Sequence, residues 1–134
     1  MTNKEIISRI FAETARGNGK PFVEALADDA VWIARGGNSW AGSYRGKEAI
    51  VGDLFRNLAE RLEGANTCIP VRIHADGEFV VVEAKGQNAL KDGRRYDNEY
   101  CFVIRMQDGK MVEITEYLDT ELVSDRLGQR GVVA

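Results

Sequence analysis

The sequence predicts a single α+β domain spanning residues 1–134, in which three helices pack over a cone-shaped, curved antiparallel sheet and enclose a small-molecule pocket. Three observations support this prediction. The chain has 134 residues, a usual size for one domain with its own core. Helical spacing of apolar residues marks the first half of the chain, and evenly spaced Asp-Gly pairs mark the second half.

The first half is predicted to form three helices and one strand. Apolar residues recur every three or four positions in residues 2–16, 21–27 and 47–62, which is the pattern of a buried helical face. Thr2 or Asn3 can cap the first helix, and Pro21 opens the second. Residues 30–34 (A-V-W-I-A) read as a strand, which a glycine-rich loop follows at 35–39.

The second half is predicted to be a four-stranded meander, which joins the N-terminal strand in one sheet. Asp-Gly pairs stand at 76–77, 92–93 and 108–109, and Asp-Gly favours the tight turn of a β-hairpin. A strand over residues 78–91 would run roughly 46 Å, too long to stay flat. Gly86, near its middle, is a natural place for a bend or bulge.

Alternation along the last strands predicts which side chains face the helices. On the last strand Val112, Ile114, Glu116 and Leu118 share the covered face, and on an earlier strand Ile69, Val71 and Ile73 do. The strand between them contributes a third inward set: Tyr96, Asn98, Tyr100, Phe102, Ile104 and Met106. Glu116, Asn98 and Tyr100 are therefore polar groups on the covered side of the sheet.

Composition narrows the classes of partner. The formal net charge is −3, so neither nucleic acid nor a membrane surface is an expected partner. Cys68 and Cys101 lie far apart, which favours a reduced, cytoplasmic protein. With one histidine, His74, and two distant cysteines, no transition-metal site is expected.

Several segments resemble the SnoaL-like branch of the nuclear transport factor 2-like superfamily. They are A-D-D-A-V-W (27–32), Y-R-G-K-E-A-I (44–50) and N-E-Y-C-F-V-I-R-M-Q-D-G-K-M-V-E-I-T-E-Y-L-D (98–119). The resemblance covers nearly the whole chain and implies the cone-shaped fold. The superfamily includes ketosteroid isomerases, polyketide cyclases and limonene-type epoxide hydrolases, so it does not by itself define a reaction.

The chain lacks the residues that two of these activities require. Limonene-type epoxide hydrolases carry an Arg-x-Asp where this chain has Ala84-x-Gly86. Ketosteroid isomerases take a tyrosine donor from the first helix, where Ile10, Phe11 and Thr14 offer none. Neither specific activity is therefore carried over.

Glu116 is the predicted catalytic residue. The resemblance implies a proton-transfer role for the acidic residue that begins the E-Y-L-D stretch at 116–119. Physically, a carboxylate on an apolar face is poorly solvated, which raises its pKa towards neutral pH and suits general acid–base chemistry. The alternative is a structural carboxylate satisfied by Arg, Tyr or a helix N-terminus.

The predicted substrate-binding residues are polar or aromatic. Asn98 and Tyr100 could hydrogen-bond a substrate oxygen, or could form a network that holds Glu116 or a water. Trp32, Trp40 and Tyr44 could form an aromatic wall, with core packing as the alternative for Trp32. Arg35 and Arg45 lie near the expected mouth of the pocket.

These residues predict an isomerase, cyclase or dehydratase that needs no cofactor and acts on a neutral, hydrophobic, carbonyl-containing small molecule. The alternatives are a non-catalytic protein that binds a hydrophobic ligand and, third, a protein-interaction module. Cys101 and Val103 lie on the outer face of the sheet, beside the outward His74, which predicts a homodimer through that face.

Overall fold

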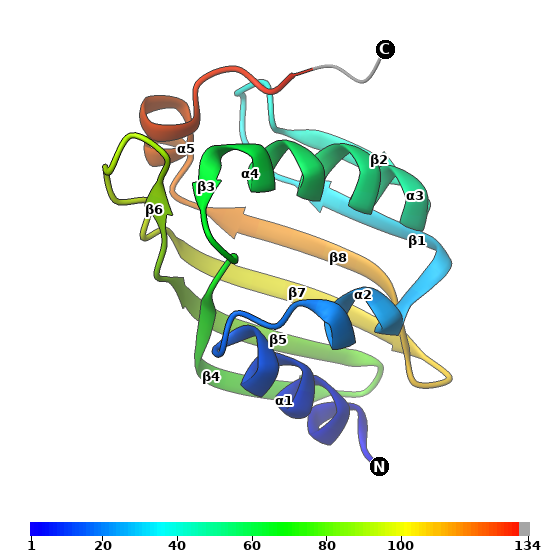
Figure 1. Ribbon diagram of the computed structural model, residues 1–134. Helices are drawn as coiled ribbons and strands as arrows, with labels where there is room; N and C mark the ends of the chain where they lie inside the picture. Colours follow the sequence, from blue (N-terminus) through cyan, green and yellow to red (C-terminus); the bar gives the residue numbers. More distant parts are fainter. Residues whose placement is uncertain (132–134) are drawn as a thin grey trace.

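The first part of the chain forms the helical layer. The computed structural model describes residues 1–131, beginning with α1 (Asn3–Thr14) and α2 (Lys20–Ala25). The Thr2 side chain caps α1 in a capping box with Glu5, as the sequence suggests. The predicted helix over 47–62 is one continuous helical stretch composed of α3 (Lys47–Ala49), the π-helical segment η1 (Ile50–Phe55) and α4 (Arg56–Arg61). All of these lie on the same side of the sheet (Figure 1).

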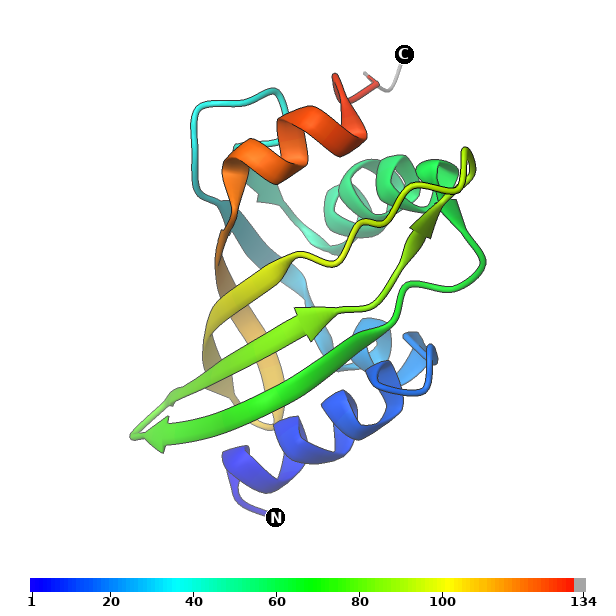
Figure 2. The same ribbon diagram turned by 90° about the vertical axis from the view of Figure 1, so that its left-hand side faces the viewer.

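The main sheet has six strands in the order β2-β1-β8-β7-β5-β4. Their bounds are Leu26–Ala34 (β1), Gly42–Arg45 (β2), Cys68–Asp76 (β4), Phe79–Gly86 (β5), Glu99–Gln107 (β7) and Lys110–Leu118 (β8). The sheet is mixed, because β1 pairs parallel to β8 while all other neighbouring strands of this sheet pair antiparallel. The predicted fold class, a curved sheet under helices, is confirmed (Figure 2). The parallel pair of β1 and β8 corrects the predicted, fully antiparallel arrangement.

Gly86 ends the long predicted strand. The chain turns away from the main sheet there, and β6 (Ala89–Leu90) pairs instead with β3 (Leu62–Glu63) in a separate two-stranded sheet. A Cβ at position 86 would lie 3.3 Å from both the Asn88 amide nitrogen and the Tyr100 ring. The meander therefore consists of β4, β5, β7 and β8, with the Asp92-Gly93 turn outside the main sheet.

Two irregularities change which side chains face the helices. The β4–β5 register shifts between Pro70 and Arg72, leaving Val71 exposed instead of inward. As a result Cys68 and Ile73 pack against the core. The predicted inward position of Ile69 is wrong as well, because its neighbour Cys68 is the residue that faces the helices at this end of β4.

A second register shift, opposite Arg105 and Met106, reverses the facing of side chains near the start of β8. Met111 is completely buried there and Val112 is only half-buried, so the predicted inward Val112 is also corrected. Beyond this shift the predicted faces hold, with Ile114 and the β7 residues Phe102, Ile104 and Met106 buried against the helices.

A fourth helix, α5 (Thr120–Leu127), follows the sheet and was not predicted. The Asp119 side chain caps it by accepting from the backbone N–H of Leu122. The loop after β1 packs against its start so closely that a Cβ on Gly36 would lie 2.7 Å from the Thr120 methyl carbon. Across residues 1–131, no helix is long and apolar enough to cross a membrane.

Candidate functional site

Glu116 lies in the middle of the covered face of the sheet. Its register partners are Phe102 on β7 and Ala34 on β1. The indole Nε1 of Trp32 donates a hydrogen bond of 3.2 Å to its Oε1. Burial raises the pKa of Glu116 to about 7, and the hydrogen bond from Trp32 opposes that rise only in part. The carboxyl is therefore divided between its protonated and ionised forms near neutral pH.

The second carboxyl oxygen, Oε2, is available to a ligand. Among the side chains and backbone groups of residues 1–131, Trp32 supplies the one hydrogen bond that the Glu116 carboxyl receives. No buried side-chain oxygen or nitrogen in this part of the chain lacks a partner, which means that Oε2 borders open space. An alternative of the sequence analysis, a carboxylate held by arginine, does not describe this geometry.

Glu116 borders a main cavity of about 360 Å³. Six of its lining residues are aromatic, and their rings pack against one another, as in the edge-on contact of Trp32 with Phe55 at 5.5 Å and the stacking of Tyr100 on Phe102 at 5.2 Å. The aromatic lining residues are Phe11, Phe22, Trp32, Phe55, Tyr100 and Phe102. A site of this size and lining suits a flat apolar ligand with few polar groups.

The main cavity opens between α2 and the segment that joins β3 to β4. The exposed lining residues mark this mouth and are Gly19, Lys20, Gly64, Ala65 and Asn66, together with Ala59 on α4. The sequence analysis expected the mouth near Arg35 and Arg45, and the structure places it elsewhere. The basic side chain that lines this cavity is Lys20, which is mostly exposed.

A second, smaller hollow of about 40 Å³ lies on the other side of Glu116. Four residues line both spaces: Leu54, Leu58, Tyr100 and Glu116. Leu54 and Leu58 come from η1 and α4, so the long helix contributes to the walls of both spaces. The small hollow also borders Ala34, Arg35 and Asn38 at the end of β1 and the start of the following loop.

Tyr100 borders both spaces, whereas Asn98 borders neither. Burial, followed by the neighbouring Tyr96, holds the pKa of Tyr100 well above its ordinary value, so its phenol stays protonated and can donate. Asn98 is completely buried, and its amide donates to the Tyr96 hydroxyl at 3.1 Å and to the Asp119 carbonyl at 3.2 Å. Asn98 thus holds Tyr96 and the end of β8, and it contacts neither the cavities nor the Glu116 carboxyl.

Trp40 belongs to a roof over the small hollow, and Tyr44 on β2 supports it. We define the roof as residues 35–41, α5 and residues 128–131. Trp40 borders the hollow, and its Nε1 donates to the Gly128 carbonyl at 2.9 Å. Tyr44 lines neither space, because its hydroxyl donates to the Trp40 carbonyl at 2.7 Å. Trp32, which the sequence analysis assigned either to a wall or to the core, lines the main cavity and contacts Glu116.

The sequence analysis missed several cavity residues. Cys68 lines the main cavity, where burial raises the pKa of its thiol to about 12 and keeps it protonated. Pro70 was the available signal, because proline inside a strand pattern indicates a bulge that reverses the facing of its neighbours. Phe11, Phe22 and Phe55 were recognised as apolar helix positions, but their spacing could not show that they surround a cavity.

The protein has the nuclear transport factor 2-like fold. This fold is defined here by the curved mixed sheet, the helices that cover it and the apolar cavity between them, which Glu116 borders. The sequence profile of the SnoaL-like domain family matches residues 7–114, and the chain belongs to that family. No curated protein matches the chain.

Solved structures of similar proteins agree with this fold. A nuclear transport factor 2-like protein from Burkholderia thailandensis is 25% identical, with a TM-score of 0.80 over 95% of this chain and 98% of its own. Another from Burkholderia xenovorans is 28% identical, with a TM-score of 0.71 over 93% and 95%. A Jannaschia protein proposed to be a SnoaL-like polyketide cyclase is 17% identical, with a TM-score of 0.75 over 96% and 93%.

Proposed function

We propose that this protein is an isomerase or cyclase that moves a proton beside a carbonyl group of a flat, hydrophobic substrate. The observation that carries the proposal is Glu116, a partly buried residue whose carboxyl borders an aromatic-lined cavity and has its pKa raised to about 7 by burial. General acid–base catalysis is most efficient when the pKa of the group lies near the working pH. The Jannaschia relative, proposed to be a polyketide cyclase, is consistent with a substrate of this class.

In this mechanism the carboxylate form of Glu116 removes a proton from the carbon next to the carbonyl. The electron pair of the broken C–H bond moves towards the carbonyl oxygen, forming an enolate. Tyr100 borders the same cavity and stays protonated, so its phenol can donate to that oxygen. Glu116 then returns the proton to another carbon, which completes an isomerisation without a change in oxidation state.

Tyr96 and Asn98 act behind Tyr100 as positioning residues. Burial raises the pKa of Tyr96 to about 12, and the amide of Asn98 donates to its hydroxyl. Tyr96 lies beside Tyr100, and both line the small hollow. The structure thus supports Tyr100 as the donor to substrate, with Asn98 one step further from the reaction than the sequence analysis expected.

The test is a panel of flat hydrophobic ketones, including 1-tetralone and β,γ-unsaturated cyclic ketones, assayed for double-bond migration or ring closure. For a ketone that is turned over, Glu116→Gln should lower kcat by about 10²-fold or more while binding persists. Glu113→Gln is the matched control, because Glu113 lies on the same strand and pairs with Val31 and Arg105. Full turnover by Glu116→Gln would remove Glu116 from the mechanism.

The second candidate function is non-catalytic binding of a hydrophobic ligand. It is favoured by the hydrogen bond from Trp32, which gives the Glu116 carboxyl a partner even when the cavity holds no ligand. Saturable binding of panel ketones without turnover, with equal affinity for the native protein and Glu116→Gln, would support this candidate over the enzyme.

We also propose that the protein is a homodimer through the outer face of its sheet. A row of mostly apolar side chains crosses that face in register, from Val81 through Val103 and Thr115 to Ile33. Phe79 and Tyr117 flank the row and remain 40% and 47% exposed. Because every helix that packs on the sheet lies on the opposite face (Figure 2), a second copy is the partner that would cover this row.

A further inference from the structure

Glu116 borders two spaces of very different size. Six aromatic residues line the main cavity, whereas the small hollow is lined mainly by apolar side chains together with Arg35, Asn38, Tyr96 and Tyr100. We infer that the small hollow is a water site through which Glu116 exchanges its proton with solvent while a ligand fills the main cavity. This inference rests on the proposed function for its purpose, but it can be tested without turnover.

The size of the small hollow fits this role. Its volume of about 40 Å³ is sufficient for one or two waters and too small for a substrate ring. A buried water also needs about two to four polar partners. Glu116 and Tyr100 offer a carboxyl and a phenol, and the free Oε2 of Glu116 has no donor among residues 1–131. A space of this size with these partners favours water over an empty void.

The hollow also leads towards solvent at a separate point from the mouth of the main cavity. Arg35 lies on its border and is exposed, at the end of β1. The mouth of the main cavity, by contrast, lies between α2 and residues 64–66. A ligand that fills the main cavity displaces water from its apolar walls, so the small hollow becomes the remaining route between Glu116 and solvent.

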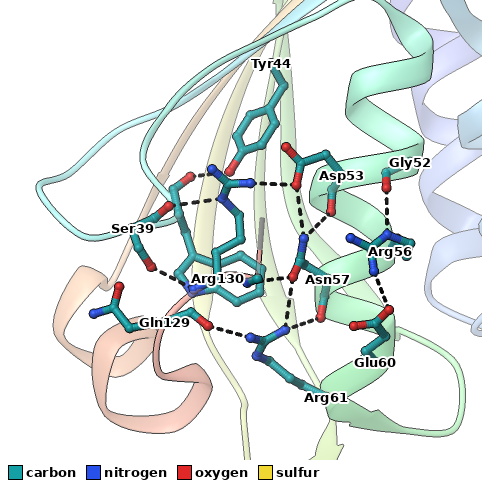
Figure 3. A network of polar contacts seen from close by, with 12 residues as sticks. Ser39, Tyr44, Gly52, Asp53, Arg56, Asn57, Glu60, Arg61, Gln129 and Arg130 are labelled. Carbon is teal, nitrogen blue, oxygen red and sulfur yellow. Dashed lines mark hydrogen bonds and ion pairs between the residues drawn. The ribbon is translucent and has the colours of Figure 1, made fainter. Parts of the chain in front are cut away.

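The roof keeps the hollow formed in the absence of ligand. Arg130 donates to the Ser39 carbonyl at 3.1 Å and pairs with the Asp53 carboxylate at 2.6 Å, which fixes the C-terminal segment to η1 (Figure 3). The Arg61 guanidinium donates to the Leu127 carbonyl at 2.9 Å and lies 4.8 Å from the centre of the Trp40 ring. Asn57 joins the helix to the C-terminal segment, because its backbone carbonyl accepts from Arg61 and its side-chain oxygen accepts from the backbone N–H of Gly131 (Figure 3).

The exchange itself is a balanced proton transfer. Protonated Glu116 gives its proton to a water in the small hollow, and the resulting hydronium passes a proton to bulk solvent. The carboxylate then takes a solvent proton by the reverse route, and no electrons are transferred. In the proposed isomerisation, a proton taken from substrate could therefore be replaced by one from solvent before it is returned.

The first test is a high-resolution crystal structure of the native protein without ligand. We expect an ordered water in the small hollow within hydrogen-bond distance of Glu116 Oε2. In Ala34→Val that water should be absent, because Ala34 borders the hollow and is the register partner of Glu116 on β1. A small hollow without water in the native protein would overturn the inference.

The second test measures proton exchange at Glu116 by infrared spectroscopy. At pH 5 the carboxyl is protonated, and its C=O band is identified by subtracting the spectrum of Glu116→Gln. The proteins are then mixed into D2O in the presence of saturating 1-tetralone, and the rate at which this band shifts is measured. The rate for Ala34→Val should be at least about tenfold lower than the rate for the native protein, since exchange then requires local opening. Ala59→Val, which narrows only the main cavity, is the matched control and should exchange like the native protein.

The outcomes separate the two proposals. Equal exchange rates in the native protein and Ala34→Val would show that the hollow is not the route. Slower exchange in Ala59→Val than in Ala34→Val would show that protons pass through the main cavity, and would also overturn the inference. A protein that exchanges as expected but turns over no ketone would retain the water site and lose the proposed enzymatic function.

Discussion

Replacing Glu116 by glutamine should change how protein stability depends on pH. Glu116 has an ordinary pKa of 4.5 in the unfolded chain and a pKa of about 7 in the folded protein. The folded protein therefore binds the proton more tightly. The stability that results is complete below pH 4.5 and is lost as the pH rises through 7. Glutamine cannot ionise, so Glu116→Gln does not suffer this loss.

The size of the effect follows from the two pKa values. One pKa unit corresponds to about 1.4 kcal/mol, so the change from 4.5 to about 7 corresponds to about 3 kcal/mol. The free energy of unfolding of Glu116→Gln, relative to that of the native protein, should rise by this amount between pH 4 and pH 8. Glutamine Oε1 can still accept from Trp32 Nε1, so the hydrogen bond of the native site is conserved.

Urea unfolding at half-unit pH intervals would measure this difference. Glu113→Gln provides the control, because it makes the same chemical change on β8 away from both cavities, and its difference from native should stay nearly constant. A constant difference for Glu116→Gln across this pH range would mean that Glu116 has an ordinary pKa, and the reasoning from its burial would be refuted.

Three further substitutions test other parts of the structure. Trp32→Phe removes the donor that lowers the pKa of Glu116, so the pH at which stability is lost in the urea series should move upwards from about 7. Val103→Glu places a charge in the centre of the apolar outer row, and light scattering should show that a dimer becomes a monomer; a native monomer at micromolar concentration would contradict the dimer. Arg61→Ala should cost about 1–3 kcal/mol and speed hydrogen exchange of the backbone N–H groups of residues 128–131, whereas Arg56→Ala, whose side chain contacts only its own helix, should not.

Local patterns were sufficient to predict most of the elements. The helical spacing identified α1 and the long helix, and the Asp-Gly pairs at 76–77 and 108–109 marked the β4–β5 and β7–β8 hairpins. Glu116 and Tyr100 were placed on the covered face by alternation, because the strands are regular between their bulges. The prediction of side-chain facing was wrong where the strands are irregular. The register shifts near Val71 and Val112 turn outward two side chains that strict alternation would place inward.

Long-range packing explains the remaining differences. The parallel pairing of β1 with β8 joins segments far apart in sequence and leaves no local signal in either strand. Asn98 has the right parity for the cavity, but its amide is used by the backbone of Asp119, which no single-strand pattern reveals. The position of the mouth depends on how α2 meets residues 64–66, and that is decided by packing between helices.

The parallel pairing also has a consequence for the order in which the protein folds. The hairpins β4–β5 and β7–β8 close over short loops, whereas β1 must join β8 across more than 80 residues of chain, as the contact between Trp32 and Glu116 illustrates. Because local contacts close at lower entropic cost, we expect the meander to form first and β1 to dock afterwards. During synthesis, β1 leaves the ribosome long before its partner strand exists. The buried carboxyl and its indole partner thus meet only in the last steps of folding, so the site is assembled after the sheet that supports it.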